Sequence, residues 1–357
     1  MPKVLFVLPV KGGSGGAHSV VQEVSGMRQL GVDAGILVNE RNFTAFRRNY
    51  ARFSWLEEAC QSFTGPKDLA ERVAGADLVV ATTNTSVHSI AEAQKAAKLS
   101  CRTAYYVQDY EPLFYEAGSE SWNIAISSFN LLRDCTYFAK TRWLRDIVRC
   151  AHGHEVAQVT PSIDRSVYFP ARRPRTDGRR TVVAMVRPAT PRRGSRRTMR
   201  VLGRLAAAHE RTTDFVVFGT TARELQEYNI QTYSNVDVAG VLLQPEVGAL
   251  LQRADFFLDL SDYQAFGRTA AEAMACGVVA LAPMIGGACE FIEHGVSSFL
   301  VDTLHDSAIM DMIERMLSMT EEELAEMRIA ALEAVASYTP QAAAISELRA
   351  FGFLASK

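Results

Sequence analysis

The chain has 357 residues, 48% of them hydrophobic and 22% charged, and its formal net charge at pH 7 is −2. This length exceeds that of a typical single domain and predicts two domains of about 150 to 180 residues each. The composition is ordinary for a globular protein. Because the charges nearly balance, composition provides no electrostatic basis for binding nucleic acid, and we expect none.

Six cysteines are scattered along the chain without a C-x-x-C pair. This usage indicates reduced thiols and argues against a disulfide framework or a zinc site. The apolar run at residues 3–10 is too short to span a membrane and lacks a signal-peptide cleavage pattern. We therefore expect a cytoplasmic protein, with peripheral contact at the inner face of the plasma membrane left open.

A glycine-rich turn follows the first predicted strand, at residues 3–10, and leads into a helix. Gly13, Gly15 and Gly16 allow the backbone of this turn to approach a phosphate or a sugar closely. The dinucleotide-binding pattern G-x-G-x-x-G would require a third glycine where the chain has His18. The turn is therefore only a weak indication of a binding site, and a nicotinamide-dependent dehydrogenase is disfavoured.

Predicted strands then alternate with helices, which is the β-α-β rhythm of a parallel sheet. In the first half these strands cover residues 33–39, 77–83, 103–108 and 134–140. Residues 140–156 predict a helix with a basic face, made of Lys140, Arg142, Arg145 and Arg149, and with Trp143 exposed. The pattern favours a solvated face, and contact with anionic lipid is the alternative.

The stretch at residues 103–122 is rich in aromatic and acidic residues and begins with a predicted strand. Gln108, Asp109 and Glu111 are suited to hydrogen-bonding sugar hydroxyls while neighbouring rings stack on the sugar. We therefore predict a sugar-binding site at these three residues. A capped strand end with surface aromatics is the alternative.

Residues 158–180 contain three prolines and no periodicity, which is typical of an interdomain linker. Eleven arginines and one aspartate lie between residues 172 and 200, and we expect most of these arginines to be solvated. Arg187 and Arg193 differ, because Arg187 ends a predicted strand and Arg193 precedes Gly194 and a helix. Both are therefore predicted at the edge where anions bind, where arginine can contact phosphate oxygens in pairs.

Residues 255–302 carry the strongest signal in the chain. An apolar strand, a polar turn at residues 262–267 and a helix that stops at Gly277 are followed by a second strand and Gly286-Gly287. In an open α/β sheet this order places backbone N–H groups and the positive end of a helix at the carboxyl edge of the sheet. Glu272 lies in the first turns of that helix, better placed for a ribose diol than for a phosphate.

These residues resemble the family-4 glycosyltransferases, which use nucleotide sugars and have the two-domain GT-B fold. The family pattern consists of two acids, then Met-Ala-Cys/Ser-Gly, then Gly-Gly and a further Glu. The corresponding residues here are Gln264, Glu272, Met274, Ala275, Cys276, Gly277, Gly286, Gly287 and Glu290. In the family the first acid reaches the donor sugar and the second holds the ribose. The first is replaced here by Gln264, whose amide donates and accepts hydrogen bonds but carries no charge.

The resemblance implies an α/β fold of two Rossmann-like domains facing each other across a cleft, with the C-terminal helix crossing back to the first domain. The acceptor domain would be residues 1–165 with helix 340–357, the linker 166–180, and the nucleotide-sugar domain 181–339. Arg187 and Arg193 would clamp the donor diphosphate. The acceptor would bind at Gln108, Asp109 and Glu111, and Asp109 would orient it. The other implied donor-binding residues are Gly13, Gly15, Gly16, Gly219, Val241, Leu242, Gln264, Phe266, Gly267, Arg268, Thr269 and Glu272.

The implied activity is that of a retaining hexosyltransferase that needs neither a metal nor a cofactor. It would move a sugar from a nucleoside diphosphate to a glycan, lipid-linked or small-molecule hydroxyl in the synthesis of surface polysaccharide or glycoconjugates. Residues 108–112 resemble bacterial rhamnosyltransferases, so rhamnose is the expected sugar. The alternatives are a catalytically inactive nucleotide-sugar-binding subunit and a GT-B nucleotide-sugar epimerase. Gln264 disfavours the epimerase, which needs acid/base pairs around the sugar.

Overall fold

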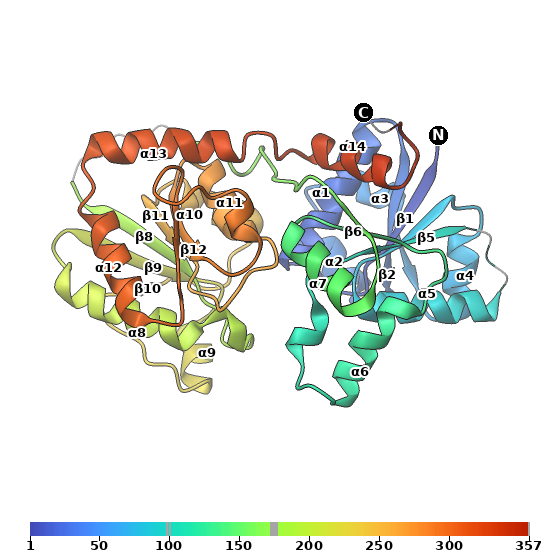
Figure 1. Ribbon diagram of the computed structural model, residues 1–357, viewed down its shortest axis with the longest axis horizontal. Coiled ribbons are helices and arrows are strands. Elements are labelled where there is room, and N and C mark those ends of the chain that lie inside the picture. Colours follow the sequence, from blue (N-terminus) through green and yellow to red (C-terminus); the bar gives the residue numbers. More distant parts are fainter. Residues whose placement is uncertain (98, 100, 172–177, 356–357) are drawn as a thin grey trace. The chain divides into compact units, whose positions relative to one another are not determined.

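The computed structural model describes residues 1–97, 99, 101–171 and 178–355, and the chain divides into two compact units (Figure 1). The first unit comprises Met1–Ser162 and Tyr338–Lys357, and the second comprises Ile163–Ser337. The predicted linker at residues 166–180 lies partly outside the described residues, at 172–177, and the rest of it is grouped with the second unit.

The described residues of the first unit form a seven-stranded parallel sheet in the order β3-β2-β1-β4-β5-β6-β7. The strands are β1 (Lys3–Val7), β2 (Asp33–Asn39), β3 (Cys60–Phe63), β4 (Leu78–Ala81), β5 (Arg102–Tyr106), β6 (Thr136–Ala139) and β7 (Val156–Gln158). In the register, Val4 lies opposite Ala34 on one side and Leu78 on the other. Strands β1 and β4 are almost entirely apolar and buried, as expected for a parallel sheet covered by helices on both faces.

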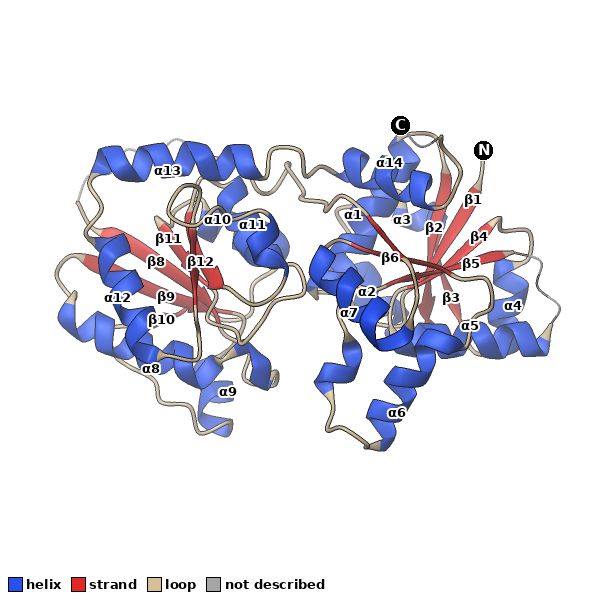
Figure 2. Ribbon diagram, in the orientation of Figure 1, coloured by secondary structure: helices blue, strands red, loops and turns tan. Residues whose placement is uncertain are grey.

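Helices surround this sheet (Figure 2). They are α1 (Gly15–Gln29), α2 (Glu40–Asn49), α3 (Leu56–Ala59), α4 (Pro66–Val73), α5 (Asn84–Ala96), α6 (Glu120–Ser127), α7 (Arg142–His152) and α14 (Pro340–Ala350), with the 3-10 turns η1 (Glu111–Phe114) and η2 (Ser128–Asn130). Side-chain caps set several starts. The Ser14 hydroxyl accepts from the N–H of Ala17 at the start of α1, and Thr83 and Ser86 form a capping box on α5.

The second unit repeats the same strand order, as β10-β9-β8-β11-β12-β13, and its described pairs are all parallel. Its strands are β8 (Arg180–Met185), β9 (Thr213–Phe218), β10 (Asp237–Val238), β11 (Phe256–Leu258), β12 (Val279–Pro283) and β13 (Phe299–Val301). Its helices are α8 (Ser195–Ala208), α9 (Ala222–Glu227), α10 (Gln244–Leu251), α11 (Arg268–Ala275), α12 (Asp306–Leu317) and α13 (Glu321–Ala334), with the 3-10 turns η3 (Pro191–Arg193) and η4 (Gly287–Glu290). The prediction of an α/β protein with two Rossmann-like units is confirmed.

The C-terminal helix α14 belongs to the first unit, as predicted, and packs against α1. The two helices meet at Gly26, where an added Cβ would collide with the carbonyl oxygen of Pro340. The Thr160 N–H also donates to Ser346 Oγ at 2.8 Å, and the Arg102 guanidinium donates to the Phe351 carbonyl at 2.8 Å. The last residues of the described chain are therefore bonded to the rim of the first sheet.

The basic face predicted for residues 140–156 differs in the structure. Lys140 precedes α7 and is buried, where its ammonium lies 3.1 Å from Glu23 Oε1 of α1. Trp143, predicted to be exposed, is partly buried. Lys140 is buried because it directly follows the apolar strand β6. The helix pattern in the sequence grouped it with the exposed arginines of α7. Among the described residues, no helix has both the length and the apolar content needed to cross a membrane.

The Gly26 contact predicts the effect of Gly26→Ala. Because the new methyl group would overlap the Pro340 carbonyl, α14 must shift, and overpacking of this kind costs about 1 to 3 kcal/mol. Urea unfolding should show the lower stability. Gly65→Ala is the control, because Gly65 is extended and nothing lies within 4 Å of its added Cβ. Equal unfolding midpoints for the two variants would contradict the close approach of α1 and α14.

Candidate functional site

The strand order of the second unit marks one edge of its sheet as a binding edge. The order reverses between β8 and β11, and ligands of open α/β sheets bind beside such a reversal at the carboxyl ends of the strands. The loop after β8 carries Arg187 and Arg193, and the loop after β11 carries Gln264. The topology thus brings these three predicted residues to the same edge of one sheet.

The loop after β8 is a compact turn held by its own backbone. The Thr190 N–H donates to the Arg187 carbonyl at 3.0 Å, and the Arg193 N–H donates to the Thr190 carbonyl at 2.9 Å. Gly194 follows in the left-handed conformation, with φ of 63°, and its Cα lies against the Leu260 carbonyl, where a Cβ would not fit. Both predicted arginines therefore lie on a single short turn.

Arg187 brings a partly desolvated positive charge to this edge. Burial lowers the pKa of its guanidinium from the ordinary value, and the Glu224 carboxylate acts in the opposite direction. Glu224 is in turn held by Thr220, whose hydroxyl donates to it at 2.9 Å. Arginine nevertheless stays charged in proteins, and a charge removed from water attracts an anion more strongly than an exposed one.

Gly219 shapes the wall next to Arg187. It has φ of 91°, and an added Cβ would lie 3.0 Å from the Val186 carbonyl oxygen and 3.7 Å from Arg187 Cγ. The glycine therefore allows the end of β9 to pack against Arg187. Further along, Val241 is 70% exposed and Leu242 is partly buried, in the loop that precedes α10.

The start of α11 holds the predicted ribose residue, Glu272. Gly267 caps the helix in the left-handed conformation, with φ of 87°. Arg268, one turn before Glu272, places its Nη1 3.4 Å from Glu272 Oε1, and the Glu272 residue is only 4% exposed. Burial and the Glu272 carboxylate raise the pKa of the neighbouring Tyr168 phenol well above its usual value. Glu272 is therefore already engaged by protein groups.

Two other predicted donor residues of this segment face apolar neighbours. Phe266 is buried, with its ring 5.4 Å from that of Phe291. The Thr269 hydroxyl lies 3.9 Å from the sulfur of Met185, the last residue of β8. Phe266 therefore packs against the segment that follows η4, and Thr269 lies against the end of β8.

Gln264 is buried, and its backbone joins two loops. Its N–H donates to the Ile285 carbonyl at 3.3 Å, and its carbonyl accepts from Gly287 at 2.8 Å. Its side-chain amide donates to Asp259 Oδ2 at 2.6 Å and to Ser261 Oγ at 3.0 Å. Asp259 and Ser261 were not among the residues predicted from the sequence to bind the donor. Their positions could have indicated them, because Asp259 directly follows the apolar residues 256–258 and Ser261 stands two positions further on.

In the first unit the glycine-rich turn and the predicted acceptor residues come together. Gly13 donates its N–H to the Tyr50 hydroxyl at 3.1 Å, and Gly15 and Gly16 begin α1. An added Cβ on Gly16 would lie 3.1 Å from the amide oxygen of Gln108, whose Nε2 donates to the Thr82 carbonyl at 3.2 Å. These loops follow β1, β4 and β5, and β1 and β4 flank the strand-order reversal of this sheet.

Asp109 and Glu111 are both held by backbone groups. Asp109 Oδ1 accepts from the N–H of Tyr110 at 2.9 Å. Glu111 accepts from the backbone N–H of Asn84 at 3.0 Å and from the side-chain amide of the same residue, at the start of α5. Burial raises the pKa of the Glu111 carboxyl to about 7, and the Asp109 charge adds to this shift. A carboxyl group that titrates near neutrality fits a polar binding site better than an inert cap.

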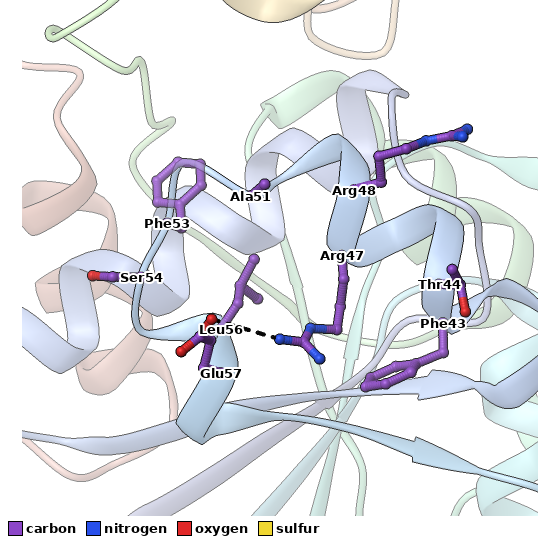
Figure 3. A pocket seen from close by; sticks show the side chains of 9 residues that line it. All are labelled: Phe43, Thr44, Arg47, Arg48, Ala51, Phe53, Ser54, Leu56 and Glu57. Atoms are coloured by element: carbon purple, nitrogen blue, oxygen red, sulfur yellow. Dashed lines mark ion pairs between the residues drawn. The ribbon is translucent and has the colours of Figure 1, made fainter.

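A cavity of about 350 Å³ lies elsewhere in the first unit, between α2 and the segment that follows it (Figure 3). Arg47 and Glu57 face each other there, 3.9 Å apart, beside Phe43 and Phe53. The residues predicted from the sequence do not line it. In the part of the chain that the structure describes, no three His, Cys, Asp or Glu side chains gather as a candidate metal site.

Comparison with solved structures identifies the class of fold. The crystal structure of Anabaena HepE in complex with UDP and glucose superposes with a TM-score of 0.80, covering 99% of this chain and 100% of that one at 17% identity. The chain therefore has the fold of the GT-B glycosyltransferases, over its full length.

Sequence comparison adds a family and two relatives. The family model for glycosyl transferases group 1 matches residues 171–334, a range that includes Arg187, Arg193 and Glu272. The O-antigen biosynthesis protein RfbC of Myxococcus xanthus is 28% identical over 222 residues, 60% of this chain and 16% of RfbC. The N-acetyl-alpha-D-glucosaminyl L-malate synthase of Bacillus anthracis is 36% identical over 81 residues, 23% of this chain and 21% of that protein. The chain spans less than a quarter of the length of these curated relatives.

The raised pKa of Glu111 predicts a pH-dependent stability. The folded chain holds the Glu111 proton up to about pH 7, whereas the unfolded chain releases it near the ordinary value of 4.5. The free energy of unfolding should therefore fall as the pH rises through this window. Glu111→Gln should flatten that fall, measured by urea unfolding between pH 4.5 and 8. Glu116→Gln, which removes an exposed carboxylate from the same loop, is the matched control, and parallel profiles for Glu111→Gln and wild type would contradict the assignment.

Proposed function

We propose that this chain is a retaining glycosyltransferase that takes a sugar from a nucleoside diphosphate and transfers it to a hydroxyl acceptor without a metal ion. The observation that carries the proposal is the single turn that holds Arg187 and Arg193 beside the strand-order reversal of the second sheet. The family match over residues 171–334 supports it, because the match contains this turn and Glu272.

Arg187, Arg193 and the backbone N–H groups at the start of α11 would bind the donor diphosphate. In the transfer, the bond between the anomeric carbon and the phosphate oxygen breaks, and its electron pair passes to that oxygen. The arginine charges stabilise the negative charge as it develops, which is often the largest contribution to catalysis. The acceptor oxygen bonds to the same face of the sugar, and its proton passes to the departing diphosphate, so no separate base is required.

Donor binding would change the neighbours of two charged residues, Arg187 and Glu272. The Glu224 carboxylate raises the pKa of Arg187 against the effect of burial, and Glu272 is paired with Arg268. A diphosphate would replace the carboxylate as the neighbour of Arg187, and a ribose diol would donate hydrogen bonds to Glu272. Because Glu272 is paired with Arg268 beforehand, its charge is not left buried and alone when the site is empty, a state that is strongly destabilising.

The acceptor would bind the first unit, at Gln108, Asp109 and Glu111, with Asp109 orienting the attacking hydroxyl. Rhamnose is the proposed sugar, and a glycan, a lipid-linked glycan or a small molecule is the proposed acceptor. The likeness to RfbC, an O-antigen biosynthesis protein, supports a surface-polysaccharide acceptor, and the UDP and glucose in the HepE structure support a nucleotide-hexose donor. Work at the cytoplasmic face of the membrane would fit such an acceptor.

A catalytically inactive nucleotide-sugar-binding subunit is the second candidate, and Gln264 in the place of an acid is the observation that favours it. The two are separated by incubating the protein with UDP-glucose, dTDP-rhamnose and related donors, with and without EDTA. Thermal stabilisation with release of nucleoside diphosphate would support the transferase, and release unchanged by EDTA would support metal independence. Stabilisation without release would favour the binding subunit.

The clamp predicts the effect of two substitutions. Arg187→Ala and Glu272→Ala should each lower turnover at least about tenfold, because each removes a charged contact to the donor. Steady-state kinetics on the active donor measures this, and circular dichroism checks that the fold survives. Arg223→Ala removes an arginine that is exposed on α9 and is the matched control. Wild-type turnover in either site variant would exclude that residue from the donor site.

A further inference from the structure

Four buried polar residues form a cluster where β11 ends. Asp259, Ser261, Gln264 and Thr303 are each at most 4% exposed. Asp259 Oδ1 accepts from the Ser261 N–H at 3.1 Å and from the Ser261 hydroxyl at 2.5 Å, and Thr303 Oγ1 donates to the Ser261 carbonyl at 2.8 Å. A buried carboxylate with this many fixed donors has a single defined orientation.

The cluster uses both hydrogens of the Gln264 amide. Nε2 donates to Asp259 Oδ2 at 2.6 Å and to Ser261 Oγ at 3.0 Å. Ser261 can accept this bond because it gives its own hydrogen to Asp259. The reverse orientation of the amide would put its oxygen against the carboxylate, where two acceptors repel. The amide oxygen, Oε1, has no hydrogen-bond partner among the described residues.

Asp259 also explains why an amide stands at position 264. A glutamate there would bring a second carboxylate to the place of the Gln264 Nε2, 2.6 Å from Asp259 Oδ2. Two buried carboxylates at that distance cannot both be ionised. In this amide–carboxylate pair the carboxylate is therefore Asp259, five positions before the amide that it holds.

The Gln264 side chain belongs to the loop that borders the proposed diphosphate turn. The Asp262 N–H donates to the Arg192 carbonyl at 2.8 Å, and the Arg192 guanidinium lies 5.1 Å from the centre of the Tyr263 ring. Arg192 directly precedes Arg193 of the clamp. A sugar joined to a diphosphate on this turn would therefore lie close to the loop that carries Gln264.

We propose that Asp259 is a positioning residue that locks Gln264 as a neutral hydrogen-bond acceptor for a hydroxyl of the donor sugar. This inference rests on the proposed function. Since both amide hydrogens are already used, Gln264 can recognise only a group that donates a hydrogen. The site therefore selects a sugar that has a hydroxyl at the position facing Gln264. It disfavours a sugar that lacks this hydroxyl or has a carboxylate in its place.

The test measures how much the sugar adds to binding. For wild type and for Gln264→Glu, Asp259→Asn and the double variant, titration calorimetry compares the Kd of UDP or dTDP with that of UDP-glucose or dTDP-rhamnose. The sugar's contribution is the ratio of the Kd of the nucleotide to the Kd of the nucleotide sugar. Each single variant should lower this ratio about fivefold or more, because one hydrogen bond contributes about 1 kcal/mol. The Kd of the nucleotide alone should not change, because Arg187 and Arg193 are untouched.

The double variant separates positioning from simple structural damage. In Asp259→Asn with Gln264→Glu the amide and the carboxylate exchange places, so the residue at 264 is again held by a donor and presents an oxygen. Recovery of the sugar's contribution in the double variant supports the proposal. Failure to recover, or single variants that bind the nucleotide sugar like wild type, would overturn it. If wild type binds neither nucleotide, the proposed function itself fails, which is a different result from loss of the sugar's contribution alone.

Discussion

The backbone of Gln264 passes so close to Gly286 that no side chain fits between them, and the two residues form a parallel bridge. A hydrogen bond from Gly287 to the Gln264 carbonyl closes the contact. The loop after β11 is thereby fastened to the loop after β12, and through Asp262 it is fastened to Arg192 in the loop after β8. Three loops from three strands behave as one edge, and the proposed donor contacts depend on that edge staying closed. Glycine is required there because the approach is between backbones.

Each unit contains a buried ion pair. In the first unit Lys140 and Glu23 lie 3.1 Å apart between β6 and α1, and Tyr106 and Ser162 each donate to the same glutamate oxygen at 3.0 Å. Close by, burial and the Glu23 charge raise the pKa of Glu347 on α14 well above its usual value. This cluster is enclosed and structural, because removing one partner would leave an uncompensated charge. Arg268 and Glu272 are also a buried ion pair, but they lie at the proposed donor site, where a ligand would take the place of a partner.

The loss of an acid at position 264 acquires a physical meaning from its surroundings. Taken alone, an amide in place of a carboxylate indicates a weakened or absent activity. With Asp259 and Ser261 holding both amide hydrogens, the same residue becomes an oriented acceptor, which preserves the direction of the hydrogen bond and discards its charge. A preorganised neutral acceptor can discriminate between sugars as sharply as a charged one, because a ligand that lacks the matching hydrogen leaves it unpaired.

Much of the fold followed from local patterns. Apolar runs such as residues 3–7 and 279–283 predicted buried parallel strands, and glycines such as Gly267 marked the starts of helices, because these features depend on neighbouring residues alone. The resemblance to a known family predicted that the last helix would return to the first unit. The prediction that Lys140 lies on an exposed face was wrong. Its partner Glu23 is more than a hundred positions away in the chain, so no neighbouring residue indicates the ion pair.

The sequence by itself determined the α/β fold class, the repeated strand–loop–helix units and the residue types available to an anion, because each of these depends on a few consecutive positions. Only the tertiary structure decided which of those residues meet. The Glu224 carboxylate acts on the charge of Arg187, Glu272 is held by Arg268 beside Tyr168, and Asp259 determines how Gln264 is presented. The reason is that strand order and loop closure determine which residues become hydrogen-bond partners and which are buried. The residues brought together in this way have no characteristic spacing in the sequence.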